Sequence, residues 1–231
     1  MIYLRNAQER GHANHGWLDS WHTFSFANYY DANFMGFSAL RVINEDVIDG
    51  GQGFGKHPHK DMEILTYVLS GTVEHEDSMG NKEQIPAGEF QIMSAGTGVR
   101  HSEYNASQDV PLHLYQIWII PDKEGIEPRY AQRRFDDVTG PQLILSPDAR
   151  EGSLKVFQDM TLSRWALKQG EEGVLDVAPQ RKIWIQVVKG DITVNGTAAS
   201  TSDGFAIWDE ATLAVTATSD AEILLFDLPA V

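Results

Sequence analysis

Short runs of β-branched and aromatic residues recur along the chain, separated by turns rich in glycine, proline and asparagine. No long stretch has the 3.6-residue apolar period of an amphipathic helix. The expected strands fall within residues 62–76, 88–96, 112–120, 181–196, 203–211, 213–220 and 222–229. Many short strands at close spacing predict an all-β sandwich or barrel.

The two halves of the chain repeat this pattern. Residues 64–80 (ILTYVLSGTVEHEDSMG) align with residues 183–196 (IWIQVVKGDITVNG), and the strands that follow keep the same order in both halves. The repeat covers a whole domain and is much longer than a solenoid unit. The segment 121–142 is rich in proline, glycine and charge, as expected of a join between domains. We therefore predict two tandem β-barrels, over residues 1–135 and 136–231.

The composition excludes several kinds of chemistry. The chain has 231 residues and a net charge of −15, and both halves are acidic, so direct binding to a nucleic-acid backbone is not expected. It has no cysteine, which excludes disulfides, thiolate ligands and a cysteine nucleophile. No stretch approaches the roughly 18 apolar residues of a membrane span, and the start lacks a secretory signal pattern. We expect a cytoplasmic protein that binds neither membrane nor nucleic acid.

The histidines are confined to the first repeat. Side chains two residues apart point to the same face of a strand, so His57 and His59 project together if Pro58 holds that segment extended. His101 and Glu103 are also two residues apart. Two strands could thus bring three imidazoles and one carboxylate to one point, a donor set that suits a divalent first-row metal. All eight histidines precede residue 114: His12, His15, His22, His57, His59, His75, His101 and His113.

The remaining histidines have less specific interpretations. His12, His15 and His22 lie among aromatic residues, and could either line a cavity mouth or belong to a segment that only packs against the barrel. We favour the second, because no spacing links them to a metal. His75 and His113 are expected to be strand or cavity-wall residues, and His113, in an apolar run, needs a polar partner.

The glycine, histidine and glutamate spacing resembles that of the cupin superfamily. Its first motif is matched by Gly51, His57, His59 and Glu63, and the opening of its second motif by Gly80, Pro86 and Gly88. The second motif ordinarily continues with a histidine where this chain has Gln91. The stretches HGWLDSWHTFSFANYYD, GFGKHPHKDMEILTYVLSGTVEHEDSMGN and IMSAGTGVRHSEYN are more specific, and together they resemble the pirin family.

This resemblance implies a bicupin, made of two tandem cupin (double-stranded β-helix, or jelly-roll) barrels. Residues 1–135 would form the metal-binding barrel, and residues 136–231 a barrel without metal ligands. The implied cofactor is one divalent transition metal, iron in the first place, with manganese, nickel, copper, cobalt or zinc as alternatives. Its implied ligands are His57, His59, His101 and Glu103.

Glu63 is the open question within the first motif. In many cupins the corresponding glutamate is a ligand, and its odd number matches those of His57 and His59. The pirin resemblance assigns the carboxylate ligand to Glu103 instead. We therefore expect Glu63 to be a hydrogen-bonding neighbour of the metal site.

The resemblance also implies an activity. Pirin-like proteins are associated with quercetin 2,3-dioxygenase activity, the opening of a flavonol ring by dioxygen. Glu103 would then be a ligand and a base toward the substrate hydroxyl, and the partners would be a flavonol-like molecule and dioxygen. The alternative is a redox-responsive regulatory protein that acts through protein partners. A metal-dependent isomerase or hydrolase is permitted by the ligand set without a supporting motif.

Overall fold

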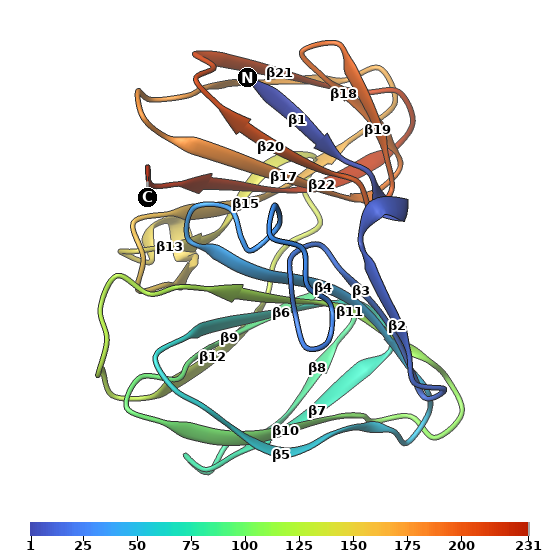
Figure 1. Cartoon of the computed structure of the whole chain (residues 1–231), viewed down its shortest axis with the longest axis vertical. Helices are drawn as coiled ribbons and strands as arrows, with labels where there is room; N and C mark the ends of the chain where they lie inside the picture. The colour runs from blue at the N-terminus through green and yellow to red at the C-terminus, as the bar shows by residue number, and fades with distance from the viewer. Residues whose placement is uncertain (231) are drawn as a thin grey trace. The chain divides into compact units, whose positions relative to one another are not determined.

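The computed structural model describes residues 1–230 and confirms the all-β prediction (Figure 1). Apart from two short 3-10 turns, the regular elements are strands. The chain divides into two compact units. We call residues 11–135 with 156–158 the N-terminal barrel, and residues 1–10, 136–155 and those from 159 onward the C-terminal barrel. Within residues 1–230, no helix has the length and apolar character needed to cross a membrane.

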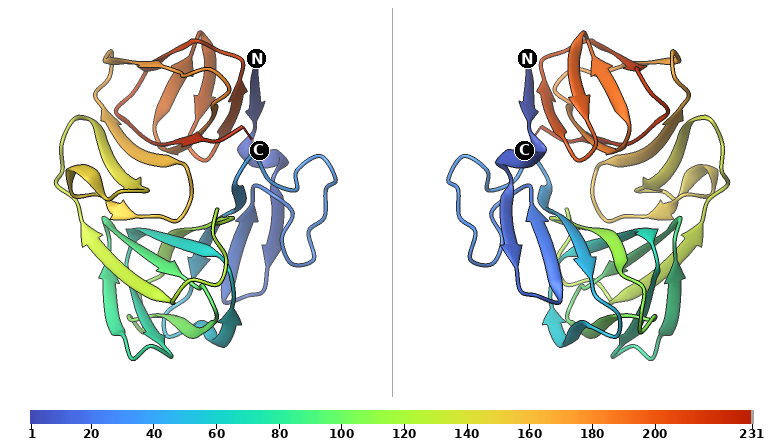
Figure 2. Two further views of the ribbon diagram at one scale, coloured as in Figure 1. Left: turned by 90° about the vertical axis from the view of Figure 1, so that its left-hand side faces the viewer. Right: turned by 90° about the vertical axis from the view of Figure 1, so that its right-hand side faces the viewer.

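The N-terminal barrel consists of two antiparallel sheets. The larger has the order β12-β9-β6-β11-β4-β3-β2 and the smaller the order β5-β10-β7-β8. The strands are β2 (Gly11–Asn14), β3 (Leu18–His22), β4 (Leu40–Ile48), β5 (Gly53–His59), β6 (Glu63–Ser70), β7 (Thr72–Asp77), β8 (Lys82–Pro86), β9 (Glu89–Ser94), β10 (Val99–Asn105), β11 (Leu112–Ile119) and β12 (Arg129–Arg134). In Figure 2 the blue strands β2 and β3 lie at one edge of this barrel, and the loop of residues 23–39 extends beyond them.

The central strands β6 and β11 are buried on both faces, which explains their nearly continuous apolar sequences. The predicted pair of strands around Ser70 and Gly71 is confirmed as β6 and β7. Gly71 has φ +83°, in the left-handed region that favours glycine. Its α-carbon also lies so close to Leu112 that an added Cβ would be 3.1 Å from the Leu112 Cα. The tight turn therefore depends on glycine at this position.

The C-terminal barrel repeats this topology. Its sheets have the orders β1-β20-β17-β22-β15-β13-β14 and β16-β21-β18-β19. The strands are β1 (Ile2–Arg5), β13 (Gly140–Ser146), β14 (Leu154–Lys155), β15 (Thr161–Leu167), β16 (Glu172–Asp176), β17 (Lys182–Lys189), β18 (Asp191–Val194), β19 (Thr197–Ser200), β20 (Gly204–Trp208), β21 (Thr212–Ala217) and β22 (Ala221–Leu228). The β17–β18 pair occupies the topological place of β6–β7, as the aligned sequences predict.

One strand comes from the far end of the sequence. β1 pairs with β20, and Ile2 and Leu4 pack against the apolar cluster of the C-terminal barrel. The first ten residues thus belong to this barrel, whereas a single division at residue 135 would group them with the other. The structural reason is that β1 supplies an edge strand next to β20, the place that β12 takes next to β9 in the N-terminal barrel.

The interiors of the two barrels differ. In the C-terminal barrel, alternate residues of β21 (Leu213, Val215 and Ala217) join Ile185 and other apolar side chains in one continuous core. In the N-terminal barrel, inward positions of the central strands also hold buried polar side chains, such as Asn44, Asp46 and Thr66. The candidate functional site lies among these polar groups.

Candidate metal centre

Three imidazoles converge where β5 and β10 pair. His57 lies directly opposite His101 in the antiparallel register, so the two side chains share a face of the sheet. Their Nε2 atoms are 3.0 Å apart. The His59 ring centroid lies 4.8 Å from that of His57 and 4.9 Å from that of His101. One potential ligand atom from each of the three residues lies within 4.8 Å of the others.

Glu103 joins this group from the next inward position of β10. The register between β5 and β10 shifts between His101 and Glu103, so that Glu103 pairs with Phe54. Its carboxylate accepts hydrogen bonds from Gln116 Nε2 (2.8 Å) and from Thr66 Oγ1 (3.3 Å). Ligand atoms of Glu103, His101 and His75 also lie within 4.8 Å of one another. The structure thus brings the four residues singled out from the sequence to adjacent positions. His57 and His59 form one group with His101, and Glu103 forms a second group with His101 and His75.

The charge state of the histidines suits a cation. Burial, with a smaller contribution from the neighbouring imidazoles, lowers the pKa of His101 to about 3 and that of His59 to about 4. Both rings are therefore neutral at pH 7, with a lone pair available on one nitrogen. His57 Nδ1 donates a hydrogen bond to the Gly55 carbonyl at 2.8 Å, which fixes the tautomer and leaves Nε2 to face the other two rings. This donor set fits a divalent transition metal.

His75 is a further polar residue beside this group. It lies opposite Glu103 on β7, is fully buried, and forms a 3.1 Å hydrogen bond through Nε2 with Asp77 Oδ2. Burial opposes ionisation of Asp77, but hydrogen bonds from Asn81, His75 and two backbone N–H groups outweigh it and lower the pKa. The sequence indicated only a strand or cavity-wall residue here, whereas the structure brings His75 beside Glu103 and His101.

Glu63 is not a neighbour of this group, so that expectation was wrong. Asp61 has φ +46° and interrupts the extended chain after His59, which breaks the parity that linked Glu63 to His57 and His59. On β6, Glu63 faces away from the side on which Thr66 reaches Glu103. Its carboxylate accepts hydrogen bonds from Ser94 Oγ (2.9 Å) and the Phe157 N–H (3.2 Å). Burial raises the pKa of Glu63, and these two hydrogen bonds partly offset the shift.

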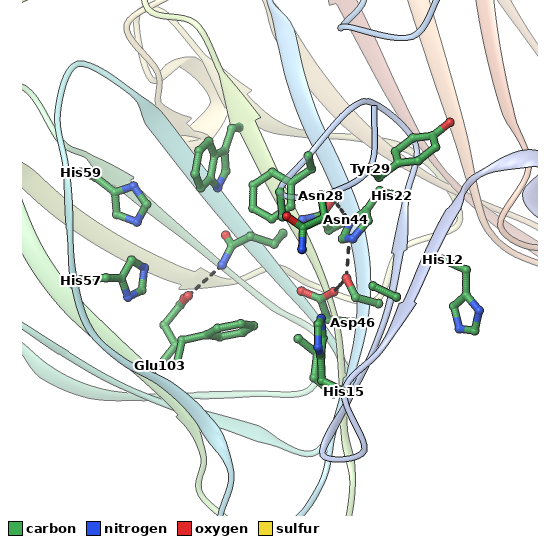
Figure 3. Close-up of a pocket in the computed structure, with 18 of the residues that line it drawn as sticks. His12, His15, His22, Asn28, Tyr29, Asn44, Asp46, His57, His59 and Glu103 are labelled. Carbon is green, nitrogen blue, oxygen red and sulfur yellow. Dashed lines mark hydrogen bonds between the residues drawn. The ribbon is translucent and has the colours of Figure 1, made fainter. Parts of the chain in front are cut away.

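The imidazoles and Glu103 line one end of a cavity of about 440 Å³ (Figure 3). The rest of the lining comes from Phe54 of β5, from β2, β3, β4 and β11, and from the loops of residues 15–17 and 23–39. His12, His15 and His22 are among the lining residues, so the favoured interpretation that they only pack against the barrel was incomplete. His22 is hydrogen-bonded as expected, donating from Nδ1 to Asn44 Oδ1 at 2.8 Å. The expected partner of His113 is Glu45, at 3.1 Å.

A second polar group lies in the same cavity, away from the imidazoles. The Ser20 hydroxyl donates a hydrogen bond to Asp46 Oδ1, and His22 and Asn44 lie next to this pair (Figure 3). Burial raises the pKa of Asp46 to about 7. The Ser20 hydrogen bond opposes this shift, while the charges of Glu103 and Glu45 add to it.

The two polar groups are linked by a row of residues across the larger sheet. His22, Asn44, Gln116, Thr66 and Gln91 occupy directly opposed positions on β3, β4, β11, β6 and β9. Opposed residues in antiparallel strands face the same side of the sheet, which here is the barrel interior. Gln91, at the position where the cupin pattern has a histidine, is the buried end of this row and neighbours Thr66.

The sequence reasoning did not identify Asn44, Asp46, Thr66 and Gln116. A signal was present, because each interrupts the apolar side of its strand. Gln116 lies between Leu114 and Trp118, for example. A polar residue at an inward position of a buried strand needs a partner or a ligand. The register that aligns these interruptions across strands cannot be read from one sequence.

Two barrels of the same topology, one with a histidine-lined cavity, define the protein as a bicupin. A family model described as pirin matches residues 3–119, and one described as the quercetinase C-terminal cupin domain matches residues 143–228. The chain therefore belongs to the pirin family.

Relatives of known name agree with this assignment. A protein of Escherichia coli (strain K12) named quercetin 2,3-dioxygenase is 75% identical over 231 residues, with 100% of both chains covered. A pirin-like protein of Caulobacter vibrioides is 39% identical, covering 98% of this chain and 99% of that protein. The crystal structure of the bacterial pirin YhhW from Escherichia coli in complex with nickel(II) matches with a TM-score of 0.98 at 74% identity, with 100% of both chains covered.

Proposed function

We propose that this chain is a metal-dependent quercetin 2,3-dioxygenase that opens the central ring of a flavonol, with dioxygen as the second substrate. The names of the close relatives support this reaction. The observation that carries the proposal is the arrangement of three imidazoles and a hydrogen-bonded carboxylate on the wall of a cavity of about 440 Å³. Such a volume is in the range of small-molecule sites.

The proposed metal ligands are His57, His59, His101 and Glu103, all in the N-terminal barrel. The nickel(II) complex of the Escherichia coli pirin supports a divalent metal in a protein of this sequence class. We propose iron as the resident metal, with nickel, manganese, cobalt, copper and zinc as alternatives that the same donors accept. A redox-active divalent metal supplies a Lewis acid for the substrate oxygens and a path for electrons between substrate and dioxygen.

The protein's own groups would then position and deprotonate the substrate. Glu103 is the proposed base, which takes the proton of the flavonol 3-hydroxyl on a carboxylate oxygen. Gln116 and Thr66 hold that carboxylate by their hydrogen bonds and so fix its orientation. Phe26 and Trp118 line the cavity with ring centroids 5.4 Å apart, and His59 packs edge-on against Trp118. These rings pack edge to face and form one apolar wall, against which a planar substrate would lie and which would exclude water on that side.

The cavity favours this proposal over a regulatory role through protein partners. A surface that recognises another protein does not require an enclosed space behind the metal ligands. The proposed enzyme does require one, because its substrate must approach the ligands from inside the barrel.

The test is turnover by protein loaded with each metal in turn. With quercetin and dioxygen, we expect loss of the flavonol absorbance, oxygen uptake and release of carbon monoxide in equal amounts. A fully metal-loaded sample that consumes no oxygen with quercetin would contradict the proposal. His101→Ala should lose both metal and turnover, and His113→Ala, which removes a histidine bonded to Glu45, should lose neither. Full metal occupancy in His101→Ala would show that the ligand set is wrong.

A further inference from the structure

The Asp46 carboxylate is a buried polar group that the proposed reaction does not use. The residue is only 3% exposed and lines the cavity. Among residues 1–230, the Asp46 carboxylate has one hydrogen-bond partner, the Ser20 hydroxyl, which donates to Oδ1. The second oxygen, Oδ2, has none. A carboxylate oxygen at this depth is costly without a donor, so the geometry calls for a donor from within the cavity.

Asp46 lies at a defined separation from Gln116, the residue that bonds the proposed ligand Glu103. Gln116 is opposite Asn44, and Asp46 is two residues further along β4 on the same face. One strand spacing and two residues along a strand put the α-carbons of Gln116 and Asp46 roughly 8 Å apart. This separation is within the length of a three-ring molecule. A planar ligand whose oxygens face Glu103 can therefore reach Asp46 with its opposite end.

The rest of the lining combines apolar side chains with amides that are already hydrogen-bonded. Leu18, Phe26, Phe54 and Trp118 supply the apolar surface. On the sheet between the two groups, Asn44 is bonded to His22, and Gln116 is bonded to Glu103 and Thr66. A ligand that matches the whole cavity is thus polar at both ends and flat and apolar between them. Polyhydroxylated aromatic molecules have this distribution.

We propose that Ser20 and Asp46 form a second binding subsite, which accepts hydrogen bonds from adjacent phenolic hydroxyls on the substrate ring that points away from the metal ligands. This inference rests on the proposed function, since it assumes that the flavonol's 3-hydroxyl and 4-oxo groups face Glu103. One hydroxyl of a catechol donates to Asp46 Oδ2, and the other donates to a lone pair of Ser20 Oγ, whose own hydrogen is directed to Asp46. In quercetin the pendant ring carries such a catechol.

The subsite makes Ser20 and Asp46 positioning residues that determine specificity. At pH 8 the Asp46 carboxylate, with a pKa of about 7, is mostly ionised, and hydrogen bonds to a charged group contribute more than those between neutral groups. We therefore expect the metal-loaded protein to bind quercetin about tenfold more tightly than galangin, which lacks both hydroxyls of the pendant ring. 3-Hydroxyflavone, which also lacks the hydroxyls of the fused ring, is the second reference ligand.

The test compares Asp46→Asn and Ser20→Ala with wild type by anaerobic titration calorimetry, with turnover in air measured in parallel. Glu45→Gln is the matched control, because it makes the same acid-to-amide change at the adjacent position of β4, where the side chain bonds His113. We expect Asp46→Asn to reduce the quercetin preference to within about twofold while galangin affinity is unchanged. Ser20→Ala should reduce the preference for quercetin over galangin partly, and Glu45→Gln should leave this preference unchanged.

The outcomes separate this proposal from the reaction itself. An unchanged quercetin-to-galangin ratio in Asp46→Asn, or an equal loss for both ligands, would overturn the subsite even if turnover is normal. A change confined to the ratio of galangin to 3-hydroxyflavone would also overturn it, because the fused ring would then face Asp46. Hydroxyl-dependent binding without oxygen uptake by wild type would support the subsite and contradict the proposed reaction.

Discussion

His57 and His101 face each other across the β5–β10 pair, with their Nε2 atoms 3.0 Å apart. Two protonated imidazoles at this distance would repel strongly, and a third ring, that of His59, lies within 5 Å of both by centroid. In the folded protein the pKa values of His59 and His101 are lowered accordingly, and both rings are neutral at pH 7. This property favours metal binding, and it makes the metal-free protein sensitive to acid.

The first prediction concerns the pH dependence of the metal-free protein. The pKa values of His59 and His101 are lowered to about 4 and about 3, whereas unfolded histidine titrates near 6.5. The unfolded state thus binds protons first as the pH falls below 6.5, and the stability contributed at neutral pH is lost between about pH 6.5 and pH 4. His101→Gln should lose less stability over this range. Urea unfolding of both chelator-treated proteins at several pH values checks this, and equal slopes would contradict it.

The second prediction concerns the support of Glu103. Gln116 Nε2 donates a 2.8 Å hydrogen bond to the Glu103 carboxylate. Gln116→Met keeps the side-chain length but removes the donor, so the carboxylate loses its fixed orientation. Removing such a partner typically lowers metal affinity about 10- to 100-fold. Competition with a fluorescent chelator measures the affinity. Gln169→Met, in the C-terminal barrel, is the control that should leave it unchanged.

The third prediction concerns Asp46, whose titration makes the protein less stable as the pH rises, the opposite of the effect of His59 and His101. Asp46 is surrounded by groups of both charges: Glu103 and Glu45 raise its pKa, while the Ser20 bond and His113 lower it, and burial dominates to give a pKa of about 7. Because the pKa of Asp46 is higher in the folded than in the unfolded state, its contribution to the unfolding free energy is fully present below about pH 4. This contribution is lost as the pH rises through 7.

Asp46→Asn removes this titration and keeps an oxygen that can accept the Ser20 hydrogen bond. We expect the variant to be more stable than wild type at pH 8, by at most about 4 kcal/mol, and the two to converge near pH 4. Water in the cavity reduces the difference below that limit. Thermal unfolding at pH 4, 6 and 8 provides the measurement, and a constant difference across this range would mean that Asp46 does not titrate as stated.

Many of the strands, and the convergence of the histidines of β5 and β10, could be predicted from the sequence because their signals are local. The alternation of His57 with His59 and of His101 with Glu103 requires only the two-residue period of a strand. Glu63 shows the limit of this reasoning, because a single left-handed residue, Asp61, reversed the face on which it lies. The Ser20–Asp46 subsite depends on the pairing of β3 with β4, which joins residues 26 positions apart. Such pairing is set by tertiary packing and leaves no local signal.

The pairing of β1 with β20 in the C-terminal barrel was not predicted, for the same kind of reason. Nothing in residues 2–5 distinguishes a strand that pairs with its sequence neighbours from one that pairs with residues 204–207. The internal repeat correctly indicated two barrels of one topology, but not which strand completes each sheet.

The last prediction tests the close approach of β5 and β10 that brings the histidines together. Gly53 lies opposite Tyr104, just past the register shift at Glu103. A Cβ at Gly53 would be 2.3 Å from the Glu103 carbonyl oxygen and 2.5 Å from the Tyr104 Cα, both backbone atoms that cannot yield without separating the strands. Gly55, on the same face two residues on, has only the Tyr104 hydroxyl within contact distance, at 3.6 Å.

Gly53→Ala should therefore cost about 1–3 kcal/mol of stability and weaken metal binding, because β5 would move away from the strand that carries His101 and Glu103. Gly55→Ala should leave both properties near wild type, since a methyl group there makes ordinary van der Waals contact. Unfolding free energies and metal affinities of the two variants provide the comparison. Equal effects would mean that the loss comes from the general cost of changing a glycine in β5, and the close approach at Glu103 would then not be what holds the two halves of the site together.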